Sequence, residues 1–155
     1  MTLRKLSAAV LASTLATGAM AQVTDSDSLS LALEVTEVNE VLFQGTSATF
    51  GGATSGSTAT DALCVFSNAN DYDLTVSSTN SFNIKNGKDT LVPYALTIGG
   101  TAANGGTVNK AGLTTASGLC SGTPSYDNAV VATLSADVTE AGSYSDEITV
   151  TIASI

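Results

Sequence analysis

The residue types that most often carry out acid–base chemistry are scarce in this 155-residue chain, which contains 14 Asp and Glu but no His. His is the commonest general base and the commonest metal ligand in proteins. A Ser-His-Asp triad is therefore impossible, although serine is plentiful. The composition argues against an enzyme before any motif is considered.

Two acidic pairs have the residue types of glycoside hydrolase carboxylates: Asp137 with Glu140, and Asp146 with Glu147. The second pair is adjacent in a stretch that we predict to be a strand, so its two side chains point to opposite faces. This geometry argues against a shared active site. An exported hydrolase is therefore the least favoured of the functions considered.

Two Asp-x-Asp motifs, Asp25 with Asp27 and Asp71 with Asp73, resemble fragments of calcium-binding loops. Neither has the Gly and the distal bidentate Glu of an EF-hand. Acidic residues in loops are usually solvated instead. We therefore expect no catalytic residues, no cofactor and no metal site.

Residues 1–21 have the features of a secretory signal peptide. Arg4 and Lys5 form the charged start, residues 6–19 form an apolar run, and Ala19-Met20-Ala21 supplies the small residues that a signal peptidase requires. Cleavage before Gln22 would leave 134 residues, with three Lys against 14 acidic residues and a net charge of −11.

The charge and the apolar runs of this mature part restrict its partners and its location. A strongly acidic chain does not match a phosphate backbone, so we expect no nucleic acid partner. No apolar run approaches the roughly 20 residues that span a bilayer, so we expect no membrane span. The chain is expected to be exported through the periplasm, into an oxidising compartment.

Two cysteines, Cys64 and Cys120, both lie in the mature part of the chain. An even number of cysteines after a signal peptide predicts a disulfide, and neither a Cys-x-x-Cys motif nor a His partner points to a redox or metal role. The bond would close a loop 56 positions long, for which chain entropy predicts a stabilisation of roughly 4 kcal/mol.

Apolar residues of the mature part alternate with polar ones, which is the pattern of half-buried strands, and no segment forms a convincing amphipathic helix. Two stretches are rich in small and polar residues: 44–60, predicted to be a loop or a weak edge strand, and 99–123, a low-complexity stretch. About seven short strands and one long-range disulfide predict an all-β, Ig-like sandwich. The positions that define the strands are Leu29, Leu31, Leu33, Val35, Val41, Phe43, Leu63, Val65, Tyr72, Leu74, Val76, Tyr94, Leu96, Ile98, Val130, Ala132, Leu134, Ile148, Val150 and Ile152.

The first of these alternating segments carries the functional information. Leu29, Leu31, Leu33 and Val35 would share one face of a strand almost at the mature terminus. An exposed apolar terminal strand invites association, so this segment could insert into another subunit's groove by β-strand addition. Burial of four such side chains would contribute on the order of 6–12 kcal/mol before ordering costs. Alternatively, the segment is an ordinary first strand that pairs within its own domain.

The C-terminal end resembles the closing strand of the spore coat protein U-like family, which includes the pilins of archaic chaperone–usher pili. The similar residues are Gly142-Ser143-Tyr144-Ser145-Asp146, followed by alternating aliphatic and Thr residues up to Ile152. Cys64, Asn70-Asp71-Tyr72 and Pro93-Tyr94-Ala95-Leu96 resemble the middle of that family. Tyr144 would either hold a corner through a hydrogen bond or pack in the core.

The chain departs from these pilins in one respect. They commonly carry a Cys in the first strand after the donor segment, whereas residues 38–43 contain none. The disulfide positions of the family therefore do not transfer to this chain, and Cys64 is expected to pair with Cys120.

The resemblance implies an incomplete Ig-like subunit, whose groove is filled first by a periplasmic chaperone and then by the N-terminal strand of a neighbouring pilin. After the signal peptide at 1–21, it implies a donor segment at 22–36 and a pilin domain at 37–155. An outer-membrane usher would export the head-to-tail filament to the cell surface, as a fimbrium that supports adhesion or biofilm formation. The implied donor residues are Leu29, Leu31, Leu33 and Val35, and the implied groove residues are Ile148, Val150, Ile152, Val41 and Phe43.

A second function from a different class remains open at this point. A self-contained secreted β-sandwich, such as a carbohydrate-binding adhesin domain, would have a similar composition. Sugar-binding faces usually need exposed aromatic rings for stacking, and this chain has 5% aromatic residues and no Trp. The aromatic content therefore favours a filament subunit over a lectin.

Overall fold

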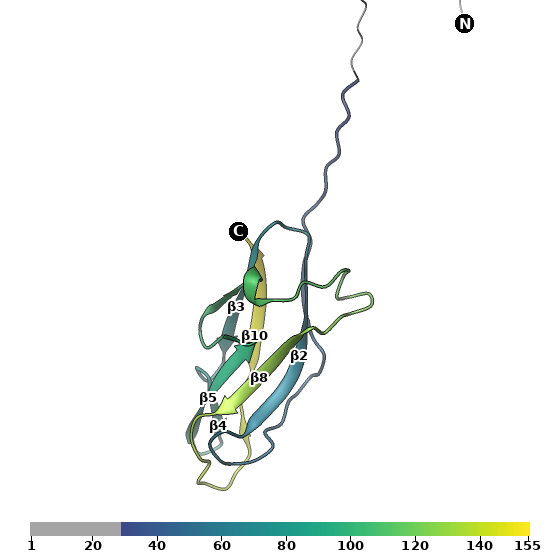
Figure 1. The fold of residues 1–155 in the computed structure, drawn as a ribbon. Helices are drawn as coiled ribbons and strands as arrows, with labels where there is room; N and C mark the ends of the chain where they lie inside the picture. Colours follow the sequence, from purple (N-terminus) through teal and green to yellow (C-terminus); the bar gives the residue numbers. More distant parts are fainter. Residues whose placement is uncertain (1–28) are drawn as a thin grey trace, which may run out of the picture. The chain divides into compact units, whose positions relative to one another are not determined.

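A computed structural model describes residues 29–155, which form strands joined by loops and one short 3-10 helix, η1 (Lys110–Gly112) (Figure 1). The predicted signal peptide and residues 22–28 lie outside the described residues. The strands are β1 (Asn39–Phe43), β2 (Thr58–Ser67), β3 (Tyr72–Ser78), β4 (Asn83–Asn86), β5 (Leu91–Ile98), β6 (Thr101–Ala102), β7 (Thr107–Asn109), β8 (Asn128–Leu134), β9 (Tyr144–Ser145) and β10 (Ile148–Ser154).

The strands form two antiparallel sheets. The larger sheet has the order β1-β2-β8-β5-β4-β9, with β6 paired to β5, and the smaller one has the order β10-β3-β7. The fold is therefore all-β, and its open, curled sheet is consistent with an incomplete Ig-like fold, as the sequence predicts. β1 and β10 are each the end strand of a sheet, which leaves one backbone edge of each unpaired among the described residues.

Alternation along the strands builds the core between the sheets. Leu74 and Val76 of β3 face inward, as do Leu96 and Ile98 of β5, and all four are at most 2% exposed. The intervening residues lie on the outer faces, because successive side chains of a strand point to opposite sides. The apolar positions predicted for β3 and β5 are the buried ones.

The disulfide joins β2 to the loop before β8. Cys64 and Cys120 are bonded, with a Cα–Cα distance of 5.8 Å, which confirms the pairing predicted from the sequence. Both cysteines are buried in a small cluster with Ala116, on the opposite face of β2 from the main core. The bond therefore fastens the long, Gly-rich loop to the sheet.

Residues 29–38 are not part of a strand in the single chain, because a strand also needs a hydrogen-bonding neighbour and none pairs with them among the described residues, so the predicted donor strand stays a prediction. The structure corrects the predicted strands in one place. The predicted closing strand is interrupted at Asp146 and Glu147, which separate β9 from β10. These two carboxylates therefore do not alternate across a strand as expected.

Candidate assembly groove

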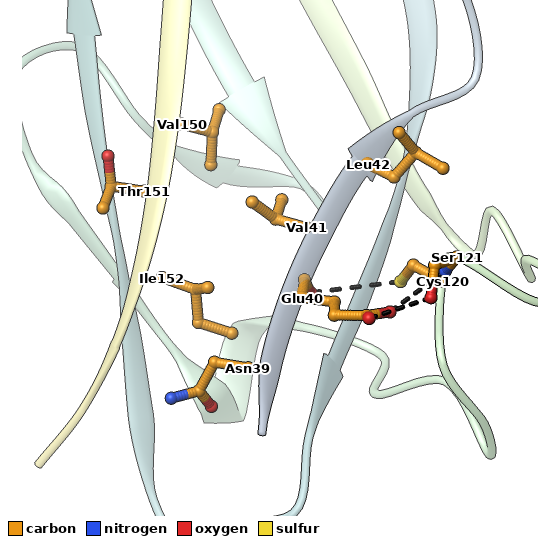
Figure 2. Close-up of a pocket in the computed structure, with 9 residues that line it drawn as sticks. All are labelled: Asn39, Glu40, Val41, Leu42, Cys120, Ser121, Val150, Thr151 and Ile152. Carbon is orange, nitrogen blue, oxygen red and sulfur yellow. Dashed lines mark hydrogen bonds between the residues drawn. The ribbon is translucent and has the colours of Figure 1, made fainter. Parts of the chain in front are cut away.

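A groove of about 480 Å³ lies between the two end strands β1 and β10. Figure 2 shows Val41 of β1 facing Val150 and Ile152 of β10 across it, whereas Leu42 and Thr151 point away. The three aliphatic side chains are half-buried and pack against the main core. The groove therefore gives an apolar floor to two unpaired backbone edges, and we call it the assembly groove.

The family resemblance implied five groove residues, and three of them lie together here. Val41, Val150 and Ile152 line the assembly groove. Phe43 and Ile148 lie on the same strands and pack, half-buried, against the main core, but they do not line the groove. Strand register explains why Val41 and Phe43 both face the core, because they are opposite the core residues Val65 and Leu63 of β2.

The remaining lining residues were not predicted. They are Asn39, Glu40, Leu42, Cys120, Ser121 and Thr151. A search for apolar periodicity selects only large aliphatic positions, so it omits polar residues of the same strands. The predicted disulfide places Ser121 near β2, but the sequence did not predict the pairing of β2 with β1, which brings Ser121 to Glu40 from about 80 positions away along the chain.

One wall of the assembly groove is held by the carboxylate of Glu40. The Ser121 N–H donates to Glu40 Oε2 at 3.0 Å, and the Ser121 hydroxyl donates to Glu40 Oε1 at 2.9 Å (Figure 2). These hydrogen bonds, the backbone one foremost, lower the pKa of the Glu40 carboxyl below its ordinary value. The disulfide loop is thus attached to both β2 and β1.

Polar residues connect the two strands at one end of the assembly groove. Asn39 Nδ2 donates to Ser154 Oγ at 2.9 Å and to Glu37 Oε1 at 2.7 Å, and the Ser154 hydroxyl also donates to Glu37. Asn39 Oδ1 is buried and has no hydrogen-bond partner among the described residues. The hydrogen bonds among Asn39, Glu37 and Ser154 therefore connect β1 to β10 at this end of the groove.

The predicted donor residues are exposed. Leu29, Leu31, Leu33 and Val35 are 84%, 86%, 89% and 71% exposed, respectively. The four positions alternate along the chain, and each carries a large apolar side chain.

A polar hub lies where the chain enters β10. Asp146 Oδ2 accepts from the Ser78 hydroxyl at 2.5 Å and from the Tyr94 hydroxyl at 2.6 Å. Asp146 Oδ1 accepts from the N–H groups of Asn80 and Glu147, both at 2.9 Å. Burial, together with the Asp146 carboxylate, raises the pKa of the Tyr94 hydroxyl, which therefore remains a donor. The hub joins β3 and β5 to the start of β10.

Tyr144, in β9 before the hub, holds a corner by hydrogen bonding and also packs against the core. Its hydroxyl accepts from Asn86 Nδ2 at 3.1 Å and donates to the Glu140 carbonyl at 3.2 Å. Both roles considered for this residue are therefore present. The side chains of Asp146 and Tyr144 fix the segment that leads into the groove strand.

Removing the Asp146 carboxylate tests this hub. We expect Asp146→Ala to lower the free energy of unfolding by about 3 kcal/mol, because the buried Tyr94 hydroxyl and the Ser78 hydroxyl both lose a charged acceptor. Urea unfolding followed by circular dichroism measures the change. The control is Glu147→Ala, since Glu147 contributes only its backbone N–H to the hub. Equal effects of the two substitutions would contradict a specific role for Asp146.

The described residues contain no helix of the length and apolarity required to cross a membrane. No protein-family model and no curated protein matches the chain. A solved structure described as "Chaperone-tip adhesin complex is vital for synergistic activation of CFA/I fimbriae biogenesis" has a chain similar to this one, with a TM-score of 0.50 and 21% sequence identity. The match covers 74% of this chain and 42% of that chain, so this chain spans less than half of its length. At this identity the similarity concerns the fold.

Proposed function

We propose that this protein is a structural subunit of an extracellular fimbria, and that it polymerises by donor-strand exchange. In this account residues 22–36 are the donor segment, 37–155 are the pilin domain, and the segment of each subunit fills the assembly groove of the next. The groove between two unpaired strand edges carries the proposal. The similarity of the fold to a protein of a fimbrial chaperone–adhesin complex supports it.

The chemistry of the donor segment matches that of the assembly groove. A strand placed there would bond to the free edge of β10 through its backbone, while its alternate side chains pack on the apolar floor. Leu29, Leu31, Leu33 and Val35 have the required spacing, and they are exposed.

The same groove implies the partners of the subunit. An exposed apolar groove with free backbone edges promotes aggregation, so a subunit in transit needs a periplasmic chaperone to cover it. Outer-membrane export through an usher would then exchange the chaperone for the next subunit. A head-to-tail contact of this kind does not close on itself and produces a filament, which places the protein on the cell surface in adhesion or biofilm formation. No catalytic step is part of this role.

Deletion of residues 22–35 in the organism that encodes the protein tests the proposal. The truncated subunit is expected to fold with its chaperone and to form the Cys64–Cys120 bond, but to give no filaments in electron micrographs and no multimers on unheated gels. A matched control exchanges Leu29, Leu31 and Leu33 for Val, which keeps the apolar alternation and should retain assembly. A truncated chain that still forms filaments, or a full chain that is a stable monomer, contradicts the proposal.

A further inference from the structure

The segment that precedes β1 has two grooves that it could enter, its own and that of a second copy. If residues 36–38 formed a three-residue turn, the segment would run back beside β1 as a hairpin. Leu33 would then lie opposite Val41, and Leu31 opposite Phe43. Side chains directly opposite each other share a face, so the apolar positions would match the assembly groove. Insertion of this segment into the groove of its own chain would therefore compete with insertion into a second copy.

Contacts of Asn68 oppose that turn. The Asn68 N–H donates to the Val38 carbonyl at 3.2 Å, and the Val38 N–H donates to Asn68 Oδ1 at 2.7 Å. Asn68 Nδ2 also donates to the Thr36 carbonyl at 2.9 Å. These bonds extend the β1–β2 pairing beyond Asn39 and Ser67. A reversal of the chain at residues 36–38 would have to break them.

The residue types at positions 36–38, which we call the linker, oppose the turn as well. Three-residue hairpin loops usually place their last residue in the left-handed region, where glycine is favoured. That residue would be Val38, and a β-branched residue in this region is strained. Glu37, at the centre of the linker, is in addition bonded to Asn39 and to Ser154 of β10. The linker thus lacks a turn residue and is fixed at its middle.

We propose that Asn68 and Glu37 form a linker lock, which prevents the donor segment from filling its own groove and reserves it for a second copy of this chain. This inference rests on the proposed function, because it presupposes that residues 29–35 are a groove-filling strand. The lock is a local property of residues 36–38 and of the side chains that hold them. It accounts for how one chain can carry both a strand and a matching groove without becoming a closed monomer.

Photocrosslinking of the full chain tests the lock. With p-benzoylphenylalanine in place of Leu33, irradiation should produce crosslinks between subunits in the otherwise unchanged protein. Asn68→Ala removes two side-chain hydrogen bonds, and one net hydrogen bond changes an equilibrium by about fivefold. We therefore expect the ratio of intramolecular to intermolecular crosslinks, measured by mass spectrometry, to rise at least about fivefold. Asn70 is also exposed and, like Asn68, lies between β2 and β3. Asn70→Ala is therefore the matched control and should leave the ratio unchanged.

A second variant keeps the test informative if Asn68→Ala folds poorly. Glu37→Gly removes the carboxylate contacts and gives the backbone more freedom at the centre of residues 36–38, so it should raise the same ratio. Crosslinks that stay intermolecular in both variants overturn the lock while leaving the proposed function intact. Crosslinks that reach neither groove in any variant contradict the proposed function itself, and the lock with it.

Discussion

Asp at positions 31 and 33 is expected to abolish subunit assembly, whereas Asp at positions 30 and 32 is expected to leave it intact. In the proposed complex Leu31 and Leu33 pack on the floor of the assembly groove, while Ser30 and Ala32 face outward. Loss of two buried leucines removes about 4 kcal/mol, or roughly a thousandfold in the association constant, and burial of unpaired carboxylates adds to the cost. Gel filtration and electron microscopy of surface material measure the effect.

The paired design of these substitutions separates burial from charge. Leu31→Asp with Leu33→Asp adds the same charge as Ser30→Asp with Ala32→Asp, so general repulsion affects both variants alike. The two variants should differ in assembly only if the donor segment binds as a strand with one buried face, because adjacent residues of a strand point to opposite sides. Equal loss of assembly in both variants would show that the alternation of the donor segment is irrelevant.

Loss of the Cys64–Cys120 bond is expected to destabilise the folded subunit by about 4 kcal/mol, since the bond closes a 56-residue separation in the unfolded chain. This is a large fraction of the 5–15 kcal/mol that typically stabilises a domain. The disulfide also holds Ser121 against Glu40 on β1, so its removal should loosen one wall of the assembly groove. Urea unfolding of Cys64→Ala with Cys120→Ala, against the oxidised protein, measures the loss.

Ser121→Ala provides the control for the disulfide. This substitution removes one hydrogen bond to Glu40 but leaves the covalent bond in place. It should change the free energy of unfolding far less than removal of both cysteines, because the Glu40 carboxylate is exposed to solvent and screened by it. A disulfide-free protein as stable as the oxidised one would contradict the view that the bond supports this small core.

Periodicity was sufficient to predict most of the fold. The alternating residues of β3, β5 and β8 identify buried strands, and the even number of cysteines identifies the disulfide. The period of two directly reflects the geometry that buries one face of a strand. An all-β, Ig-like sandwich could therefore be inferred before the structure was seen.

Short and polar elements could not be predicted in the same way. β6 and β7 lie within the low-complexity stretch 99–123, and they have only two and three residues, too few to show a period. Three of the four residues of β4 are polar, and the Asn86-Gly87 pair at its end is typical of a turn. These elements are strands because they pair with a neighbouring strand, and the partner lies elsewhere in the sequence.

Only part of the groove lining could be named from the sequence. The family resemblance implied Val41, Val150 and Ile152, whereas Asn39 and Ser121 reach the groove through contacts distant in sequence. The break at Asp146 also escaped prediction, because the four hydrogen bonds that hold its carboxylate come from side chains and backbone groups of separate segments. Polar sites of this kind depend on tertiary structure.

The most direct test of donor-strand exchange is the position of the donor in the assembled filament. With p-benzoylphenylalanine in place of Leu31, irradiation of surface filaments should join subunits into ladders, and mass spectrometry should map the bond to β1 or β10 of the neighbouring subunit, near Val41, Val150 or Ile152. Filaments whose crosslinks from position 31 fall outside the assembly groove would contradict the account.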